Sequence, residues 1–268
     1  MTGPAQAHPQ EQRAHGWISL PGVRVGGMRI ATASRDALAG AMVADCLAAR
    51  RGETAPRPRL IFSANGHALS LRETDSAYRA AVDQADVIHA DGGFLVTASR
   101  LLTSTPIAER SATTDMIHDC AAQAAAHGLS FYLLGGTEQV NADCARILAD
   151  TYPGLVIAGR RHGYFSPEEE DDIVAGINAV QPDVLWVGLG KPREQLFSVR
   201  HRDRLRAGWL VTCGGCFNFV TGDYRRAPAW MRNHNLEWLH RMLSQPRKLF
   251  RRYLLTTPHA LWLVLTRR

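Results

Sequence analysis

The run Pro182-Asp183-Val184-Leu185-Trp186-Val187-Gly188-Leu189-Gly190-Lys191-Pro192 joins an apolar strand to a glycine-rich loop. Residues 183–187 have the length and composition of a strand. A helical pattern over 192–206 follows the loop at once, and another apolar strand at 209–212 follows that helix. Strands that alternate with helices in this way predict an α/β fold with a largely parallel sheet.

The same alternation extends toward the N-terminus. Further strands are predicted at 23–31, 59–63, 87–89, 130–134 and 155–158, and further helices at 35–50, 73–85, 113–127, 139–152 and from 166 onward. We therefore expect a Rossmann-like α/β domain over 17–222, with helices on both faces of a mostly parallel sheet. Residues 1–16 are predicted to be a disordered tail. Residues 223–268 are predicted to form a basic helical appendage within the same functional unit.

Polar residues follow several of these strands inside glycine loops. Asn65 follows the strand at 59–63, Asp91 the strand at 87–89, and Lys191 the strand at 183–187. The carboxyl ends of parallel strands meet at one edge of a sheet, where α/β proteins bind their ligands. A glycine after a strand is usually an ordinary turn, but five such loops together favour a phosphate- or nucleotide-binding edge.

The C-terminal segment has a charge balance of its own. Residues 225–268 contain ten Lys and Arg residues and one acid, Glu237, which gives +9. Because the whole chain carries +6, the remaining residues carry −3. Trp, Phe and Tyr residues are interleaved with the basic ones. This composition points to a polyanionic partner: the phosphates of a nucleotide, a nucleic acid, or an anionic membrane surface.

Two helices are predicted in this segment, at 230–243 and 247–256, separated by Pro246 and ended by Pro258. In the second helix, basic residues repeat on one side and apolar residues on the other. Such a helix is typical of a membrane-surface segment. A helix packed on the domain with a solvated basic face fits the same pattern, so both interpretations stay open here.

Several chemistries lack the residues that they need. Arg193 stands where the dinucleotide fingerprint requires a third glycine, and there is no Walker loop. No Asp-x-Asp pair is present to hold a divalent ion, so neither a metal nor a cofactor is expected. Cys213 and Cys216 have the spacing of a redox pair, but they follow a late strand and no second pair completes a zinc site. Reduced, buried thiols are expected.

The motifs resemble those of a known family. After 182–192 come Gly214-Gly215-Cys216-Phe217, Arg226-Ala227-Pro228-Ala229-Trp230 and Glu237-Trp238-Leu239-His240-Arg241, and then Pro246-Arg247 and Arg252-Tyr253. Together they resemble the WecG/TagA/CpsF family of bacterial glycosyltransferases, over about 23–253. The resemblance implies transfer of a sugar from a UDP donor to a lipid-diphosphate-linked saccharide, in wall teichoic acid, enterobacterial common antigen or exopolysaccharide assembly.

The resemblance also implies roles for individual residues. Asp91 matches the aspartate thought to be the family's catalytic base. The predicted substrate-binding residues are Ser63, Asn65, Arg110, Asp115, Gly135, Gly136, Gly188, Gly190, Pro192, Gln195, Arg226, Arg232, Arg241, Arg247 and Arg252. Three positions depart from the family pattern: Ser63 replaces a threonine, Thr113 replaces a glycine, and Glu194-Gln195 reverses the usual order of amide and acid.

The function expected from this resemblance is an inverting, metal-independent transfer that gives a β-linkage. The partners would be a UDP-sugar donor, a polyprenyl-diphosphate-linked saccharide acceptor and an anionic membrane surface, but no nucleic acid. The location would be cytoplasmic, peripheral to the inner face of the cell membrane. Arginines before Pro246 are expected to face the diphosphate, and those after it mainly the membrane. The donor sugar stays open among glucose, N-acetylmannosamine and its uronic acid. The alternative is a peripheral membrane or nucleic-acid-binding protein without catalysis.

Overall fold

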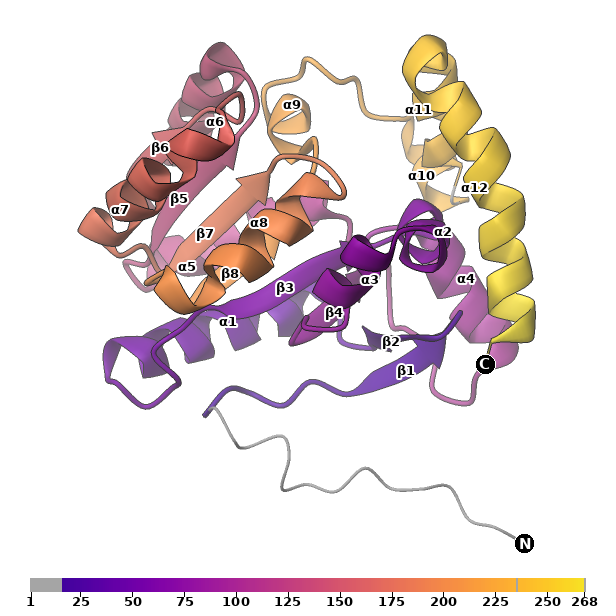
Figure 1. Ribbon diagram of the computed structural model, residues 1–268, viewed down its shortest axis with the longest axis horizontal. Helices are drawn as coiled ribbons and strands as arrows, with labels where there is room; N and C mark the ends of the chain where they lie inside the picture. The colour runs from indigo at the N-terminus through magenta and orange to yellow at the C-terminus, as the bar shows by residue number, and fades with distance from the viewer. Residues whose placement is uncertain (1–15, 235, 268) are drawn as a thin grey trace, which may run out of the picture.

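A six-stranded parallel sheet forms the centre of the protein (Figure 1). The computed structural model describes residues 16–234 and 236–267, so 1–15 of the predicted tail lie outside the described residues. The strand order is β4-β3-β8-β7-β5-β6. The strands are β3 (Arg59–Ala64), β4 (Val87–Ala90), β5 (Ser130–Gly135), β6 (Val156–Arg161), β7 (Val184–Gly188) and β8 (Trp209–Thr212). This arrangement confirms the predicted α/β class.

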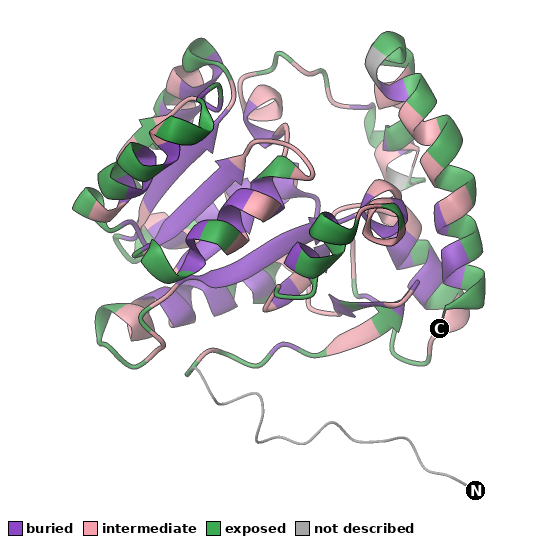
Figure 2. Cartoon of the chain, viewed as in Figure 1, coloured by how far each residue is buried: buried purple, intermediate pink, exposed green. Residues whose placement is uncertain are grey.

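Helices cover both faces of the sheet because successive strand residues point to opposite sides. Phe131 and Trp186 pack on the side of α1 (Arg35–Arg50), α5 (Thr113–Ala126), α6 (Glu138–Thr151) and α9 (Cys216–Val220). Tyr132 and Leu185 pack on the other side, with α2 (Gly66–Thr74), α3 (Ser76–Val82), α4 (Gly93–Leu102), α7 (Glu170–Val180) and α8 (Arg193–His201). Figure 2 shows the central strands buried between these layers. The edge strand β6 has only half-buried and exposed residues.

Two parts of the helical prediction are wrong. The predicted helix at 73–85 is divided between α2 and α3, because Asp75 ends α2 and caps α3 by accepting a hydrogen bond from the Tyr78 N–H at 2.9 Å. The helices α4 and α9 were not expected, because a pair of glycines at the start of each predicts only a turn: α4 begins at the second glycine of its pair, Gly93, and α9 directly after Gly215. The β segment predicted at 23–31 is an antiparallel hairpin of β1 (Gly22–Val25) and β2 (Met28–Ala31), which packs beside β4.

The C-terminal segment folds as α10 (Ala229–Asn233), α11 (Glu237–Ser244) and α12 (Pro246–Thr266). Contrary to expectation, Pro258 lies inside α12 and does not end it. The reason is burial: Ala260, Leu263 and Val264, which follow the proline, are at most 3% exposed and join the core beside α2. Burial of such side chains stabilises the helix enough to offset the backbone hydrogen bond that proline removes. In the part of the chain that the structure describes, no helix has the length and apolarity needed to span a bilayer.

Candidate active site

A cavity of about 600 Å³ lies beyond the carboxyl ends of the strands. The loops after β3, β4, β7 and β8 form its floor, while residues of α11 and α12 form the facing wall. Four of the five glycine loops therefore converge as predicted, and the loop after β5 does not reach the cavity. Seven of the predicted site residues line it: Ser63, Asn65, Asp91, Arg110, Gly190, Arg241 and Arg252.

Asp91 is held in place by donors from two other loops. Its Oδ1 accepts hydrogen bonds from the Thr113 N–H at 3.0 Å and the Thr113 hydroxyl at 3.2 Å, at the N-terminus of α5. Its Oδ2 accepts one from the Asn65 amide at 3.3 Å, and the Asn65 Oδ1 also caps α2 through the Ala68 N–H. Thr113, the departure from the family pattern, is thus a direct partner of the predicted base.

The carboxyl of Asp91 is strongly acidic. Burial alone would raise its pKa, but the cations Lys191 and Arg110, together with the Thr113 N–H, lower the pKa to about 2. Arg110 also donates to the Asp91 backbone carbonyl at 3.0 Å. Asp91 is therefore ionised throughout the physiological range, as an acceptor for a proton must be.

The loops carrying Asn65 and Asp91 touch closely enough to require glycine at position 92. A Cβ atom on Gly92 would lie 2.8 Å from the Asn65 Cβ, well inside van der Waals contact. Any larger residue would push the two loops apart and break the hydrogen bond between Asn65 and Asp91. The glycine in the Asp-Gly pair thus positions the carboxylate.

Lys191 and Glu194 form a second polar cluster on the cavity floor. The Lys191 ammonium donates to the Ser63 hydroxyl at 2.8 Å and lies 3.7 Å from Glu194 Oε1. Glu194 is fully buried, and its Oε2 accepts hydrogen bonds from the N–H groups of Gly190 at 3.0 Å and Gly214 at 2.9 Å. This acid therefore ties together the loops after β7 and β8.

Gln195 lies behind this cluster and does not line the cavity. Its amide donates to Glu194 Oε1 at 3.1 Å and to the Thr212 hydroxyl at 3.3 Å, in the buried layer below the loops. Because acid and amide are reversed, the acid Glu194 binds the backbone N–H groups of the loops, and the amide of Gln195 lies in the core. The result is structural support for the floor.

The other predicted glycines and Pro192 shape the strand ends. A Cβ on Gly135, whose φ is +142°, would lie 2.3 Å from the Gly188 carbonyl oxygen, so these adjacent strand ends meet only because side chains are absent. Gly136 follows directly, and Pro192 precedes α8. The predicted residues that do not line the cavity are Asp115, Gly135, Gly136, Gly188, Pro192, Gln195, Arg226, Arg232 and Arg247.

Ion pairs fasten the wall formed by α11 to the α/β domain. Glu237, whose side chain is 9% exposed, pairs with Arg110 at 2.5 Å and lies 3.9 Å from Arg226. Arg226 in turn makes two hydrogen bonds to Asp115, at 2.6 and 3.2 Å. The ion pair of Asp115 and Arg226 therefore connects the appendage to α5, and the two charges neutralise each other.

Arg241 and Arg252 present guanidinium groups to the cavity from the wall. Arg241 lies over the Phe219 ring at 5.1 Å, and Arg252 over Tyr253 at 5.1 Å. Neither has an acidic partner among residues 16–234 and 236–267. The expected division of arginines at Pro246 does not hold, since Arg252 follows that proline and still lines the cavity, whereas Arg232 precedes it and does not.

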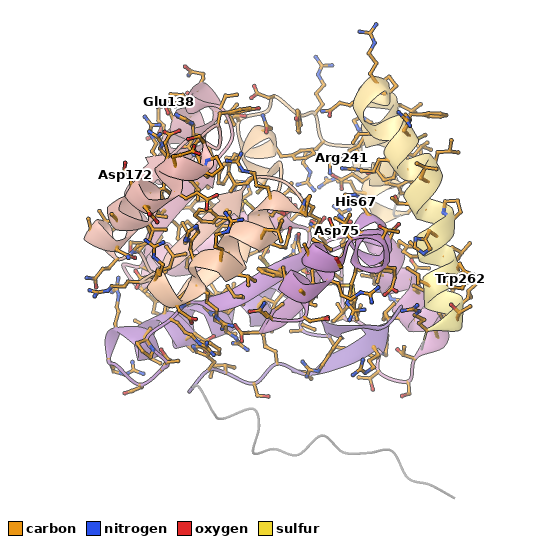
Figure 3. The ribbon with its side chains drawn as sticks, viewed as in Figure 1. His67, Asp75, Glu138, Asp172, Arg241 and Trp262 are labelled. Atoms are coloured by element: carbon orange, nitrogen blue, oxygen red, sulfur yellow. The ribbon has the colours of Figure 1, made fainter. Side chains whose placement is uncertain are left out.

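His67 adds a neutral polar group at the same place. Burial, reinforced by the nearby charges of Arg252 and Lys191, lowers its pKa to about 4. Figure 3 shows His67 and Arg241 on the side of the molecule where α2 faces α11 and α12, with Glu138 and Asp172 at the opposite end. The predicted site residues did not include His67 or Glu237. Lys191 was placed at the predicted binding edge by its glycine loop, but it was not assigned a substrate contact.

An ionised aspartate and several cations at the carboxyl edge of a parallel sheet are typical of α/β proteins that bind phosphorylated ligands there. A family model described as "Glycosyl transferase WecG/TagA/CpsF family" matches residues 23–268. Two relatives, from Staphylococcus aureus strains MRSA252 and MW2, are named N-acetylglucosaminyldiphosphoundecaprenol N-acetyl-beta-D-mannosaminyltransferase. Each is 30% identical over 191 residues, which cover 71% of this chain and 74% of the relative. The chain belongs to the WecG/TagA/CpsF family of glycosyl transferases, which confirms the resemblance seen in the motifs.

Proposed function

We propose that this glycosyltransferase is inverting and metal-independent, and that it moves a hexosyl or N-acetylhexosaminyl group from a UDP-sugar to a polyprenyl-diphosphate-linked saccharide, giving a β-linkage. The observation that carries the proposal is the Asp91 carboxylate, which is ionised and faces a cavity lined by cations. The relatives' names point to a lipid-linked N-acetylglucosamine as the acceptor class.

In this mechanism Asp91 accepts the proton of the attacking hydroxyl. A carboxylate with a pKa of about 2 is a weak base toward a free alcohol. The hydroxyl becomes far more acidic once its oxygen begins to bond to the anomeric carbon, so the proton moves late in the reaction. The C–O bond to UDP breaks on the opposite face of the sugar, and the anomeric configuration inverts. General-base assistance of this kind contributes roughly 10²- to 10⁴-fold.

The wall arginines supply charge on the donor side. Arg241 and Arg252 have no carboxylate neighbours in the described chain, and a diphosphate would provide the anion that they lack. Neutralisation of the departing diphosphate by fixed cations stabilises the transition state because the groups are oriented before the reaction. We therefore assign these two residues, with the floor loops, to UDP binding.

The acceptor is attached to a membrane lipid, and the outer side of the appendage suits an anionic membrane surface. Nine of the fourteen exposed large hydrophobic residues described lie between Trp230 and Leu265. Leu255 is 67% exposed and Trp262 54% exposed on α12, and the basic residues Arg247 and Arg251 are also exposed. Apolar and basic side chains together are typical of peripheral membrane association.

A UDP-release assay tests this function. Purified protein is incubated with UDP-glucose, UDP-N-acetylglucosamine, UDP-N-acetylmannosamine or its uronic acid, each with a short-chain lipid-diphosphate N-acetylglucosamine. Acceptor-dependent UDP release with one donor, and a β-linked product by NMR, is the expected result. An α-linked product would refute inversion if the donor sugar is α-linked, and release of a different nucleotide would refute the UDP assignment.

A further inference from the structure

We propose that Lys191 binds the terminal phosphate of the departing nucleoside diphosphate and stabilises it as the glycosidic bond to the donor breaks. The proposal rests on the proposed function, since it names the group that the leaving UDP meets on the cavity floor. It assigns a substrate contact to a residue that is not among the substrate-binding residues predicted from the sequence.

Lys191 has unused hydrogen-bonding capacity in a nearly closed position. Its side chain is 10% exposed and lines the same cavity as Asp91. Of its three N–H donors, one serves the Ser63 hydroxyl at 2.8 Å. The nearest carboxylate oxygen, on Glu194, is 3.7 Å away, which is too far for a hydrogen bond. Its other two donors have no hydrogen-bond partner among the described residues.

Glu194 forms an ion pair with this lysine but accepts no hydrogen bond from it. Its Oε2 is occupied by the N–H groups of Gly190 and Gly214, and its Oε1 accepts from Gln195. Burial raises the pKa of Glu194, so its negative charge is costly to maintain in this position. A nearly buried ammonium with spare donors and a shared counterion favours an additional anion.

The position of Lys191 relative to Asp91 selects which anion. Lys191 and Asp91 line the same cavity, on the loops after β7 and β4. Of the neighbouring charges, that of Lys191 lowers the pKa of Asp91 most. As the acceptor oxygen bonds to the anomeric carbon, its proton passes to Asp91. The bond from that carbon to the phosphate oxygen breaks, and its electron pair stays on the terminal phosphate. Lys191 is the cation of the floor, opposite the wall arginines, available to this developing charge.

The test compares the binding of UDP and UMP, which differ only in the terminal phosphate. Affinities are measured by calorimetry for the full-length protein and for Lys191→Met, Lys191→Arg and the double variant Lys191→Met/Glu194→Gln, which keeps the pair neutral. Arg193→Met is the matched control. Arg193 follows the same loop, and its guanidinium donates to the Gly163 and Phe165 carbonyls outside the cavity. If Lys191→Met does not fold, the double variant provides the measurement.

We expect the preference for UDP over UMP to fall roughly 10- to 100-fold in Lys191→Met and in the double variant, as for the loss of a charged hydrogen bond. It should be retained in Arg193→Met and largely retained in Lys191→Arg. An unchanged preference in the folded Met variants overturns the role of Lys191 and leaves the proposed function standing. If the unmodified protein itself does not prefer UDP to UMP, the UDP-dependent function fails first. A third outcome also overturns the proposal: Lys191→Met binds UDP-glucuronic acid more weakly but binds UDP-glucose and UDP as the unmodified protein does. Lys191 would then contact a carboxylate of the donor sugar and not the phosphate.

Discussion

Replacement of Asp91 by asparagine should separate catalysis from binding. The asparagine Oδ1 can still accept from the Thr113 N–H, which now lies 3.0 Å from the aspartate oxygen. Its amide would face the Asn65 amide, at present 3.3 Å from the other oxygen, so that weak hydrogen bond is lost. The side chain keeps its shape but can no longer take a proton. We expect kcat to fall by about two orders of magnitude or more, while UDP affinity changes only a few-fold.

The same substitution should also lower the free energy of unfolding. The pKa of Asp91 falls from its ordinary value of 3.8 to about 2 in the folded protein, a difference near two pH units. Because the folded-state pKa is depressed, ionised Asp91 contributes stability above pH 3.8 and loses it as the pH falls toward 2. At pH 7 the contribution is about 2 kcal/mol. The neutral asparagine forfeits it, which corresponds to a decrease in Tm of roughly 4–8 °C.

Both effects can be measured on one preparation. Turnover is followed by UDP release, UDP affinity by calorimetry, and Tm by scanning calorimetry at pH 7. Asp115→Asn is the comparison, since Asp115 is paired with Arg226 and lies outside the cavity. Near-normal turnover in Asp91→Asn would remove the base assignment. An increase in Tm would refute the electrostatic account, because it would mean that burial outweighs the neighbouring cations.

Three further predictions concern metal, pH and the membrane. EDTA should leave turnover nearly unchanged, because fixed cations line the cavity, and a loss of activity restored by Mg²⁺ or Mn²⁺ would contradict this. The fully buried His89 has its pKa lowered to about 4 by burial, so the unfolded chain takes up a proton below pH 6.5 while the folded protein does not. The free energy of unfolding should therefore decrease by about 2 kcal/mol between pH 7.5 and 5 from this residue alone. His89→Asn should show a smaller decrease in Tm over that range. An equal decrease in the two proteins would show that other groups control the acid sensitivity. The double variant Leu255→Ser/Trp262→Ser should bind anionic vesicles at least roughly tenfold more weakly in a sedimentation assay. The control Val180→Ser, at a residue of α7 that is 42% exposed, should bind as the unmodified protein does. Equal binding by the unmodified protein and both variants would remove the membrane role of α12.

The sheet could be predicted because its strands are short apolar runs that alternate with helices. For the same reason the floor of the site was accessible from sequence. Parallel strands must place Asn65, Asp91 and Lys191 at one edge, wherever the helices go. Glycine loops after the strands gave the right place for the cavity, and the structure adds that Gly92 is required by its contact with Asn65. Local pattern and topology together were sufficient for this half of the site.

The wall could not be predicted in the same way, since its contacts join residues far apart in the chain. The pair formed by Arg110 and Glu237 spans 127 residues, and that of Asp115 and Arg226 spans 111. Charge counting identified a basic segment but not which arginines are already paired with acids. Tertiary structure decides this. Arg226 is paired with Asp115 of the α/β domain, while Arg252 has no acidic partner in the part of the chain that the structure describes and lines the cavity.

Helix α12 contacts the cavity, the core and the solvent with different side chains, and this limits which variants can separate its roles. Arg252 lines the cavity, Leu263 is wholly buried in the core beside α2, and Leu255 is 67% exposed to the outside. Removal of the helix would therefore open the cavity and expose the core, in addition to deleting any membrane contact. The outer face is about one helix diameter, roughly 10 Å, from the cavity side. If that face rests on the membrane, the cavity is held at a fixed height near the lipid headgroups, where the acceptor diphosphate lies. Substitutions on the exposed face alone, and not truncation, can isolate this contribution.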